Sequence, residues 1–428
     1  MTTPVPDTSA APLSSLPLSS SSSSSPSSAP KPAHFSLDKA IRKNILALLP
    51  YRCARDDYEE GILLDANENA IGHSLPPSEQ QGVAVDTTFD LFDLNRYPSP
   101  LHNDLKERLC LLRGVPSPSN FFLGVGSDEA IDLLFRIACI PGKDRVLVCP
   151  PTYGMYGVCA QVNDVEVVKV DLDTEGGKFL PNVDEINRTL SAASKTANPI
   201  KLTFLCSPGN PTGTLIPLAD VRAVLSNPDY DGLVVVDEAY IDFADPSRDS
   251  AVKLLVEEGW SNLVVMQTLS KGFGLAAIRL GIAISSPPLV QVLNNIKAPY
   301  NISTPTATLA KRALSDSGLA LFRTNIATLN ENRAWLRAAL GATPGVIAIL
   351  GAGHANFLMA QIGAKDGKAD NDLAKRAYLH LAEREKVVVR FRGNEVGCEA
   401  CLRVTVGTRN ECEEVVRVLG AFLERERA

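Results

Sequence analysis

The middle of the sequence alternates short apolar runs with segments of helical periodicity, and this alternation constrains the fold more than any other feature. The apolar runs at 145–149, 202–206, 233–236 and 263–266 are each followed by polar or glycine-rich turns. The run at 233–236 is apolar throughout, which is typical of a central parallel strand covered on both faces. Strands that alternate with helices predict an α/β domain with a mostly parallel sheet flanked by helices.

After residue 303 the pattern changes to one of mixed strands and helices. A long helical pattern covers 306–340, and another covers 372–384. Short strand patterns lie at 346–350, 356–360, 387–390 and 401–406, and a last helix starts near 411. We therefore predict a large domain over 70–303 and a smaller α+β domain over 304–428. We expect residues 36–69 to form an N-terminal arm and helix that belong to the small domain.

The first 35 residues are rich in Ser, Pro and Ala, with an unbroken serine run at 19–25. They have neither the apolar core of a secretory signal nor the arginines of a transit peptide. We predict that residues 1–35 are a disordered tail and that the protein is cytoplasmic. No apolar run reaches the roughly 18 to 20 residues of a membrane helix.

Charge and cysteine content exclude some partners. The net charge is −7, so the chain lacks the basic excess that a nucleic-acid partner requires. The nine cysteines are irregularly spaced and lie mostly in apolar runs, as buried thiols do in a reducing compartment. Cys398 and Cys401 form a lone Cys-x-x-Cys pair without two further ligands nearby, so we predict no metal site.

A lysine follows the apolar run at 263–266, where parallel sheets commonly bind ligands. Lys271 is surrounded by glycines and by the hydroxyls of Thr268 and Ser270, and Arg279 follows. Hydroxyls and a guanidinium are suited to holding a phosphate. An amine beside a phosphate site indicates a Schiff base with pyridoxal phosphate. The alternative is a surface lysine in a glycine-rich loop.

Two further sites follow earlier strands. Ser127 and Asp128 lie where the glycine turn at 124–126 opens a helix, and the helix dipole and backbone N–H groups favour an anion there. A simple helix cap would have the same residues. Tyr153 follows the run at 145–149, where its ring could stack on a planar ligand or pack in the core.

Polar residues also follow the two central strands. Asn210 lies in a turn after the run at 202–206 and is suited to hydrogen-bonding a phenolic oxygen, although a structural turn would also favour Asn. Asp237 ends the run at 233–236, and a buried carboxylate there needs a cation such as a protonated pyridine nitrogen, unless it only caps the next helix. Tyr240 is close enough in sequence to reach the same ligand.

Together, these motifs resemble the aspartate-aminotransferase family of fold type I pyridoxal-phosphate enzymes, from about residue 36 to the C-terminus. Within that family the chain is most similar to the histidinol-phosphate aminotransferases, of class II. The resemblance rests on Leu64–Asn69, Asn95–Pro98, Gly126–Glu129, Asp237–Tyr240, Thr268–Lys271, Pro299–Asn301 and Leu402–Thr408.

The resemblance implies a role for each candidate. Lys271 would form the Schiff base with pyridoxal 5'-phosphate and move the substrate proton. Asp237 would pair with the pyridine nitrogen. Asn210 and Tyr240 would hold the ring oxygen, and Tyr153 would stack on the ring. The phosphate would be held by the amides of Ser127 and Asp128, by Thr268, Ser270 and Arg279, and by Tyr97 from a partner subunit, which implies a homodimer with shared active sites.

The resemblance also implies substrates. L-Histidinol phosphate and 2-oxoglutarate would give imidazole acetol phosphate and L-glutamate in L-histidine biosynthesis. Arg403, and by spacing Arg390, would bind the anionic groups of both substrates, with Arg392 as a weaker candidate. A related aromatic aminotransferase or phospho-amino-acid decarboxylase is the alternative. A ligand-sensing regulator is disfavoured, because the tail has no helical pattern and almost no basic charge.

Overall fold

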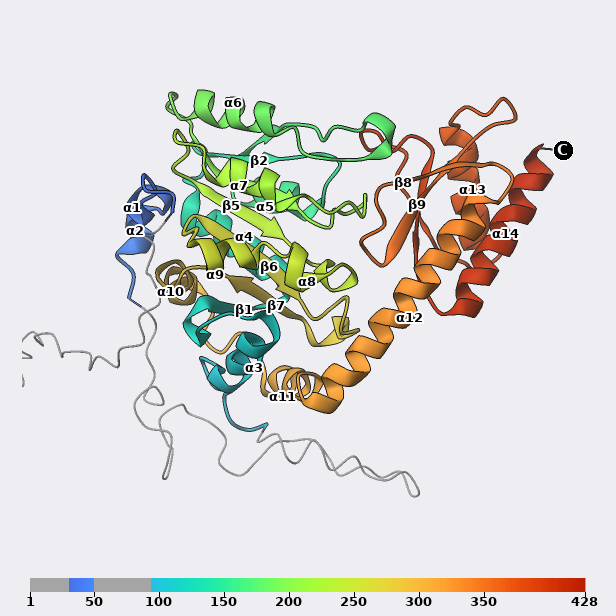
Figure 1. Ribbon diagram of the computed structural model, residues 1–428. Helices are drawn as coiled ribbons and strands as arrows, with labels where there is room; N and C mark the ends of the chain where they lie inside the picture. Colours follow the sequence, from blue (N-terminus) through green and yellow to red (C-terminus); the bar gives the residue numbers. More distant parts are fainter. Residues whose placement is uncertain (1–30, 50–93, 428) are drawn as a thin grey trace, which may run out of the picture.

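The protein, in a computed structural model, consists of two sheets with helices packed on them (Figure 1). The structure describes residues 31–49 and 94–427. Most of the predicted tail, and the motif Leu64–Asn69, lie outside the described residues. The large sheet has the strand order β1-β7-β6-β5-β4-β2-β3, and the small sheet has the order β10-β11-β9-β8.

The large sheet confirms the predicted parallel arrangement. Only β7 among its strands is antiparallel to its neighbours, β1 and β6, and the other pairs are parallel. The strands are β1 (Phe121–Val125), β2 (Arg145–Val148), β3 (Glu166–Lys169), β4 (Ile200–Cys206), β5 (Leu233–Asp237), β6 (Leu263–Thr268) and β7 (Leu280–Ile284).

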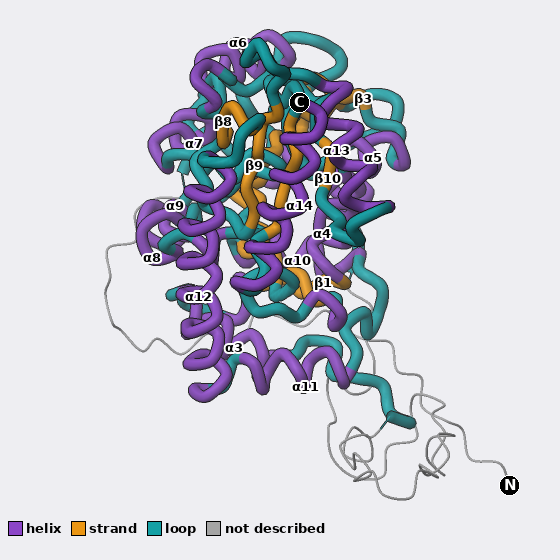
Figure 2. Tube along the Cα trace, turned by 90° about the vertical axis from the view of Figure 1, so that its right-hand side faces the viewer, coloured by secondary structure: helices purple, strands orange, loops and turns teal. Residues whose placement is uncertain are grey.

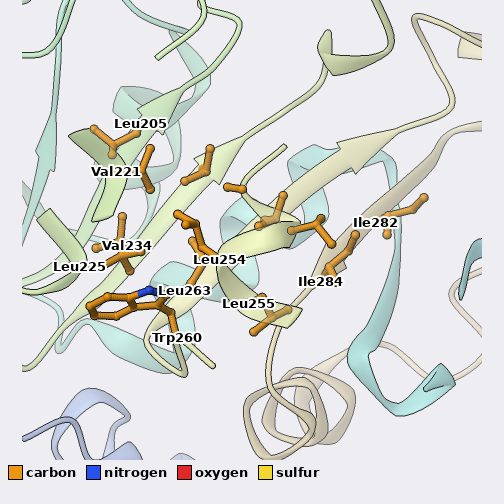
Figure 3. Packing of buried hydrophobic residues seen from close by; sticks show 14 of the residues in the cluster. Leu205, Val221, Leu225, Val234, Leu254, Leu255, Trp260, Leu263, Ile282 and Ile284 are labelled. Atoms are coloured by element: carbon orange, nitrogen blue, oxygen red, sulfur yellow. The ribbon is translucent and has the colours of Figure 1, made fainter. Parts of the chain in front are cut away.

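Helices cover both faces of this sheet, because alternate residues of each strand face opposite sides. In β5, Val234 belongs to one apolar cluster and Val235 to the other. Figure 3 shows the first cluster, where Leu263 of β6 lies near Leu254 and Trp260. That face is covered by α3 (Asn103–Arg113), α6 (Val183–Ala193), α7 (Leu218–Leu225) and α9 (Val252–Glu258). The opposite face is covered by α4 (Gly126–Ala138), α5 (Met155–Val162) and α10 (Pro287–Ile296).

The small sheet is antiparallel. Its strands are β8 (Val346–Leu350), β9 (Phe357–Ile362), β10 (Arg390–Phe391) and β11 (Cys401–Thr405). A separate apolar cluster joins it to α12 (Asp316–Gly341), α13 (Asn371–Glu383) and α14 (Arg409–Arg427). These helices lie on one face of the sheet (Figure 2), and α12 links the two sheets along its length (Figure 1).

Three segments differ from the sequence prediction. The helical pattern at 306–340 is two helices, α11 (Thr304–Ala313) and α12, because the Ser315 hydroxyl accepts a hydrogen bond from Gly318 N and caps a new helix. The mostly apolar pattern at 278–284 predicts a strand that includes Arg279, but β7 starts at Leu280, since Arg279 has a left-handed backbone with φ of 53°. The strand predicted at 387–390 is reduced to the two residues of β10.

The described part of the N-terminal arm packs on the large domain, where we had expected the small one. It forms two short helices, α1 (Leu37–Ala40) and α2 (Lys43–Leu46). Ala40 and Ile41 belong to the apolar cluster under α4 and α10, and Arg42 N donates to Ile137 O at 2.8 Å.

The domain boundary at residue 304 stays a prediction. Ala307 and Ala310 of α11 still pack in the core of the large domain, so α12 is the element that leaves it. In the described ranges, no helix is both long and apolar enough to cross a membrane.

Candidate active site

A cavity of about 460 Å³ opens where the carboxyl ends of β4, β5 and β6 face the small sheet. This edge is the usual ligand site of open α/β sheets. Every predicted site residue except Tyr97 lines it: Ser127, Asp128, Tyr153, Asn210, Asp237, Tyr240, Thr268, Ser270, Lys271, Arg279, Arg390 and Arg403. Arg392, the weaker candidate, also lines it, and three further lining residues were not predicted: Cys206, Ala239 and Ala276.

Asp237 is the buried carboxylate of the cavity. It ends β5 and is 3% exposed. Its Oδ2 accepts a hydrogen bond from Tyr156 OH at 2.6 Å, and its Oδ1 accepts one from Ala239 N at 3.3 Å. Burial raises the pKa of Asp237 to about 6, and the hydrogen bond from Tyr156 opposes that rise. A cation in the cavity would favour the ionised carboxylate further.

Lys271 lies in the turn after β6. Burial lowers its pKa, and the positive charges of Arg403 and Arg279 lower it further. Its Nζ lies 5.7 Å from the centroid of the Tyr240 ring, and within the described chain it has no hydrogen-bond partner. A lysine with a lowered pKa and a free Nζ is suited to nucleophilic attack and to proton transfer.

The turn that carries Lys271 rests on a buried ion pair. Arg113, the last residue of α3, lies 2.8 Å from Asp242, and the side chains of the two are 5% and 3% exposed. A Cβ on Gly272 would lie 2.5 Å from Asp242 Oδ2. The turn therefore approaches this pair so closely that only glycine fits at position 272.

One end of the cavity is suited to an anion. Ser127 and Asp128 lie in the first turn of α4, where backbone N–H groups and the helix dipole favour negative charge. A Cβ on Gly281 would lie 2.1 Å from the carbonyl carbon of Gly126, so glycine lets β7 approach the start of this helix. The hydroxyls of Thr268 and Ser270 are 2.9 Å apart on the same wall.

Two side chains link these walls. Arg279 Nη2 lies 3.6 Å from Asp128 Oδ2. Tyr153 OH donates to the other oxygen of Asp128 at 3.1 Å.

Tyr240 is buried, which raises its pKa to about 12, so its hydroxyl stays protonated and can donate a hydrogen bond at neutral pH.

Arginines of the small sheet form the other end. Arg403 of β11 donates from Nη1 to Asn210 Oδ1, and its guanidinium lies 5.2 Å from the centroid of the Phe357 ring. Arg392 follows β10 and pairs with Glu395 at 2.6 Å. The Nε atoms of Arg403 and Arg392 are buried and have no partner in the parts of the chain that are described. The guanidinium groups of Arg390, Arg392 and Arg403 line this end of the cavity, and such groups fit an anionic ligand.

Tyr156 and Arg392 show the limits of the sequence prediction, and the role predicted for Tyr97, in the site of a partner subunit, stays a prediction. Tyr97 lies outside the cavity, 52% exposed, with its ring stacked 4.6 Å from that of Tyr300. Tyr156 contacts Asp237 but was not predicted, because a tyrosine in an apolar helix reads as core. Its position three residues after Tyr153, at the start of the helix that follows, was the available signal. Arg392 was only a weaker candidate, although it directly follows β10, which begins at Arg390.

Comparison with known proteins identifies the family. Residues 59–419 match the family described as aminotransferase class I and II. The chain belongs to the class I and II aminotransferases. It is 47% identical over 399 residues to the histidinol-phosphate aminotransferase of Schizosaccharomyces pombe, covering 91% of this chain and 98% of the relative. It is 43% identical over 396 residues to that of Saccharomyces cerevisiae, covering 90% and 96%.

A solved structure shares the fold of this aminotransferase. The histidinol-phosphate aminotransferase of Sinorhizobium meliloti, in complex with pyridoxal 5'-phosphate, superposes with a TM-score of 0.67 at 22% identity. The match covers 84% of this chain and 90% of the other.

The cavity fits pyridoxal 5'-phosphate on its own chemistry. The cofactor carries an aldehyde, a basic ring nitrogen and a phosphate, and the site offers a free amine, a buried carboxylate and a helix N-terminus. The buried carboxylate and the helix N-terminus are each costly to bury without a partner of opposite charge. The carboxylate matches the protonated ring nitrogen of the cofactor, and the helix N-terminus matches its phosphate. Among the described residues, no group of three or more His, Cys, Asp or Glu side chains is arranged to hold a metal ion.

Proposed function

We propose that this aminotransferase transfers the amino group of L-histidinol phosphate to 2-oxoglutarate, giving imidazole acetol phosphate and L-glutamate in L-histidine biosynthesis. The relatives of that name from Schizosaccharomyces pombe and Saccharomyces cerevisiae are 47% and 43% identical over nearly the whole chain. The observation that carries the proposal is the free Nζ of Lys271 in one cavity with the buried carboxylate of Asp237 and the arginines of the small sheet.

Pyridoxal 5'-phosphate is the cofactor, and when bound it accepts the electrons released as the Cα–H bond of an amino substrate breaks. Lys271 Nζ takes up and returns the substrate proton. Asp237 holds the positive charge of the ring nitrogen. Tyr240 and Asn210 bind the ring oxygen, and Tyr153 lies against the ring. The cofactor phosphate is held by Ser127, Asp128, Thr268, Ser270 and Arg279.

The arginines of the small sheet bind the substrate anions. Arg403 and Arg390 hold the phosphate of the amino donor and the carboxylates of 2-oxoglutarate, because guanidinium groups bind both anions in a bidentate manner. Arg392 lies in the same wall of the cavity and adds positive charge. One anion site thus serves both substrates in turn.

The absorbance spectrum of the purified holoprotein tests this function. Histidinol phosphate is added without 2-oxoglutarate, and we expect the visible band of the bound cofactor to convert to that of its aminated form. A band that ignores histidinol phosphate but responds to phenylalanine would favour an aromatic aminotransferase. Release of CO₂ from a phospho-amino acid would favour a decarboxylase. No band after addition of pyridoxal phosphate would contradict the assigned cofactor.

We further propose a homodimer in which Tyr97 reaches the cofactor phosphate of the partner subunit. The position of Tyr97 on the surface, outside the cavity of its own chain, supports this arrangement. Mixing Tyr97→Ala and Lys271→Ala variants should restore part of the activity, because one site of each mixed dimer would be intact. Absence of restored activity, despite demonstrated subunit exchange, would count against shared sites.

We also propose a cytoplasmic location. The cysteines in the described ranges are all free thiols, and most are buried, which suits a reducing compartment. Fractionation of cells should recover the protein with cytoplasmic markers, and recovery with an organelle would contradict the proposal.

A further inference from the structure

We propose that Tyr156 is a positioning residue that holds Asp237 as a carboxylate directed at the cavity, and thereby sets the pH range in which the cofactor binds. The inference rests on the proposed function, because it gives Asp237 the positively charged ring nitrogen as partner. Tyr156 does not line the cavity itself, so it acts through Asp237.

An aromatic stack fixes the Tyr156 ring. Tyr156 is fully buried at the start of α5, and its ring stacks on that of Phe204 of β4 at 4.4 Å between centroids. Phe204 stacks in turn on Phe135 of α4 at 5.7 Å. On the cavity side, the edge of Tyr156 meets Tyr153 at 5.6 Å with an interplanar angle of 87°. A ring packed on both sides cannot swing, so its hydroxyl stays on Asp237.

The hydrogen bonds to Asp237 leave one side of the carboxylate open. Tyr156 OH donates to Oδ2 and Ala239 N donates to Oδ1. An ionised carboxylate has about four lone-pair sites, so Asp237 can still accept a bond from the cavity. The same aromatic stack places Tyr153 in the cavity wall. Tyr156 thus orients both the carboxylate and the ring proposed to lie against the cofactor.

The charge of Asp237 depends on several surrounding groups. The titratable groups that face it are Asp128 of α4, Tyr153 just before α5, Tyr156 at the start of α5, Cys206 of β4, Tyr240 of its own loop and Lys271 after β6. Burial raises the pKa of Asp237 to about 6 and Asp128 adds to the rise, while Lys271 lowers it. The largest opposing effect is the hydrogen bond from Tyr156.

The substitution Tyr156→Phe removes this hydrogen bond and keeps the ring. We expect the pKa of Asp237 to rise by about 1 to 2 units, the value of a hydrogen bond to a charged group. The dissociation constant of pyridoxal 5'-phosphate is measured on the apoprotein as a function of pH, and it should increase on acidification in the wild type and in the variant. The pH midpoint of this increase should lie about 1 to 2 pH units higher in Tyr156→Phe. An unmoved midpoint would overturn the proposal.

Tyr230→Phe is the matched control. Tyr230 is equally buried, and its hydroxyl donates to Leu233 O at 2.9 Å and accepts from Thr203 Oγ1 at 3.1 Å. It lies outside the cavity lining. Its substitution removes a buried hydroxyl of the same kind, so we expect a comparable loss of stability and no change in the pH midpoint of cofactor binding.

Thermal unfolding of the apoprotein provides a readout independent of cofactor and substrate. The folded-state pKa of Asp237 is raised above the ordinary value of 3.8, so stability falls as pH rises through the folded pKa. In Tyr156→Phe this loss should continue to higher pH. Its melting-temperature deficit should therefore grow between about pH 6 and pH 8, whereas the deficit of Tyr230→Phe should stay constant.

The two readouts separate this inference from the proposed function. Suppose that the melting-temperature deficit of Tyr156→Phe grows with pH, but the spectrum of the wild-type holoprotein does not respond to histidinol phosphate. The role of Tyr156 would then stand, and only the proposed substrate would be overturned. A constant deficit together with normal turnover of histidinol phosphate would overturn the role of Tyr156 and leave the function intact.

Discussion

Asp237 and Glu238 are consecutive buried carboxylates at the end of β5, and they face opposite sides of the sheet. Glu238 accepts hydrogen bonds from Ser250 Oγ at 2.7 Å, Ala251 N at 2.5 Å and Gln267 Nε2 at 2.8 Å. Asp237 accepts only two and keeps its remaining capacity for the cavity. Both carboxylates are equally costly to bury. What distinguishes the functional one is the bonding capacity that the protein leaves unused.

The side of Glu238 continues as a buried polar network away from the cavity, in which Gln267 Oε1 and Arg113 Nε have no hydrogen-bond partner among the described residues. Burial raises the pKa of Glu238 to about 7, and the positive charge of Arg113 acts against that rise. Arg113 also pairs with Asp242, which lies two residues after Tyr240 and against Gly272. This network therefore supports the loops that carry Tyr240 and Lys271. The following substitutions test the contrast between an open side, which faces the cavity, and a side away from the cavity that fixes geometry.

The largest effect should come from Lys271→Ala on the open side. Loss of the proton-transferring amine should reduce turnover by about 10²- to 10⁴-fold. The visible band of the bound cofactor should also disappear. The far-ultraviolet circular dichroism should be unchanged. Lys253→Ala, on the outside of α9, is the control and should retain activity and spectrum. Substantial turnover by Lys271→Ala would refute the assigned role.

Asp237→Asn should come next. It replaces a charged partner of the ring nitrogen with a neutral isostere, and breaking a buried charge pair costs roughly 10²- to 10³-fold in binding or rate. The apoprotein should melt no lower than the wild type above about pH 6, because an unpaired buried charge is removed. Near-normal cofactor affinity in this variant would contradict the open-side assignment.

Arg113→Met should affect stability more than chemistry. It leaves Asp242 as an uncompensated buried charge, so we expect the free energy of unfolding to fall by about 3 to 5 kcal/mol. Urea unfolding of the apoprotein measures this loss. Adding Asp242→Asn to the same chain should recover part of it, since the stranded charge is then removed. A loss below ~1 kcal/mol would place this pair among ordinary surface ion pairs.

Glu238→Gln should have the smallest effect, about 1 to 3 kcal/mol of stability, because one donor of the network loses its acceptor. Turnover should remain within a few-fold of the wild type. The folded-state pKa of Glu238 lies above its ordinary value of 4.5, so the wild type loses stability as pH rises to about 7 and the variant does not. Its deficit should narrow over that range. If the stability deficit of Glu238→Gln instead widens as the pH rises, a raised folded-state pKa of Glu238 would be contradicted.

Most of the site could be predicted from sequence because each functional group directly follows a recognisable strand. Asp237 ends an entirely apolar run, and Lys271 and Asn210 follow two others. Parallel strands bring their carboxyl ends to one edge of the sheet, so separate motifs along the chain converge in space. The α/β class followed from the same alternation.

The remainder depended on tertiary contacts that no local pattern encodes. Tyr156 is identified by its hydrogen bond to Asp237 of β5, which the sequence does not reveal. Within the apolar sequence of α5, a tyrosine is expected to be an ordinary core residue. The break between α11 and α12 depends on a serine cap inside an otherwise continuous helical pattern. Arg279 carries a left-handed backbone next to Gly126 at the start of α4, and its apolar neighbours indicated a strand.

The cavity wall is contributed by two separate sheets, with the lysine and the carboxylate on the large one and Arg390 and Arg403 on two adjacent strands of the small one. With the roles proposed above, reactivity and selectivity reside on parts of the chain that can diverge at different rates. A laboratory library restricted to β10, β11 and the turn between them would sample new amino donors while leaving the reacting groups intact. Related enzymes of the same fold could evolve different substrates in the same way, through changes in the small sheet alone.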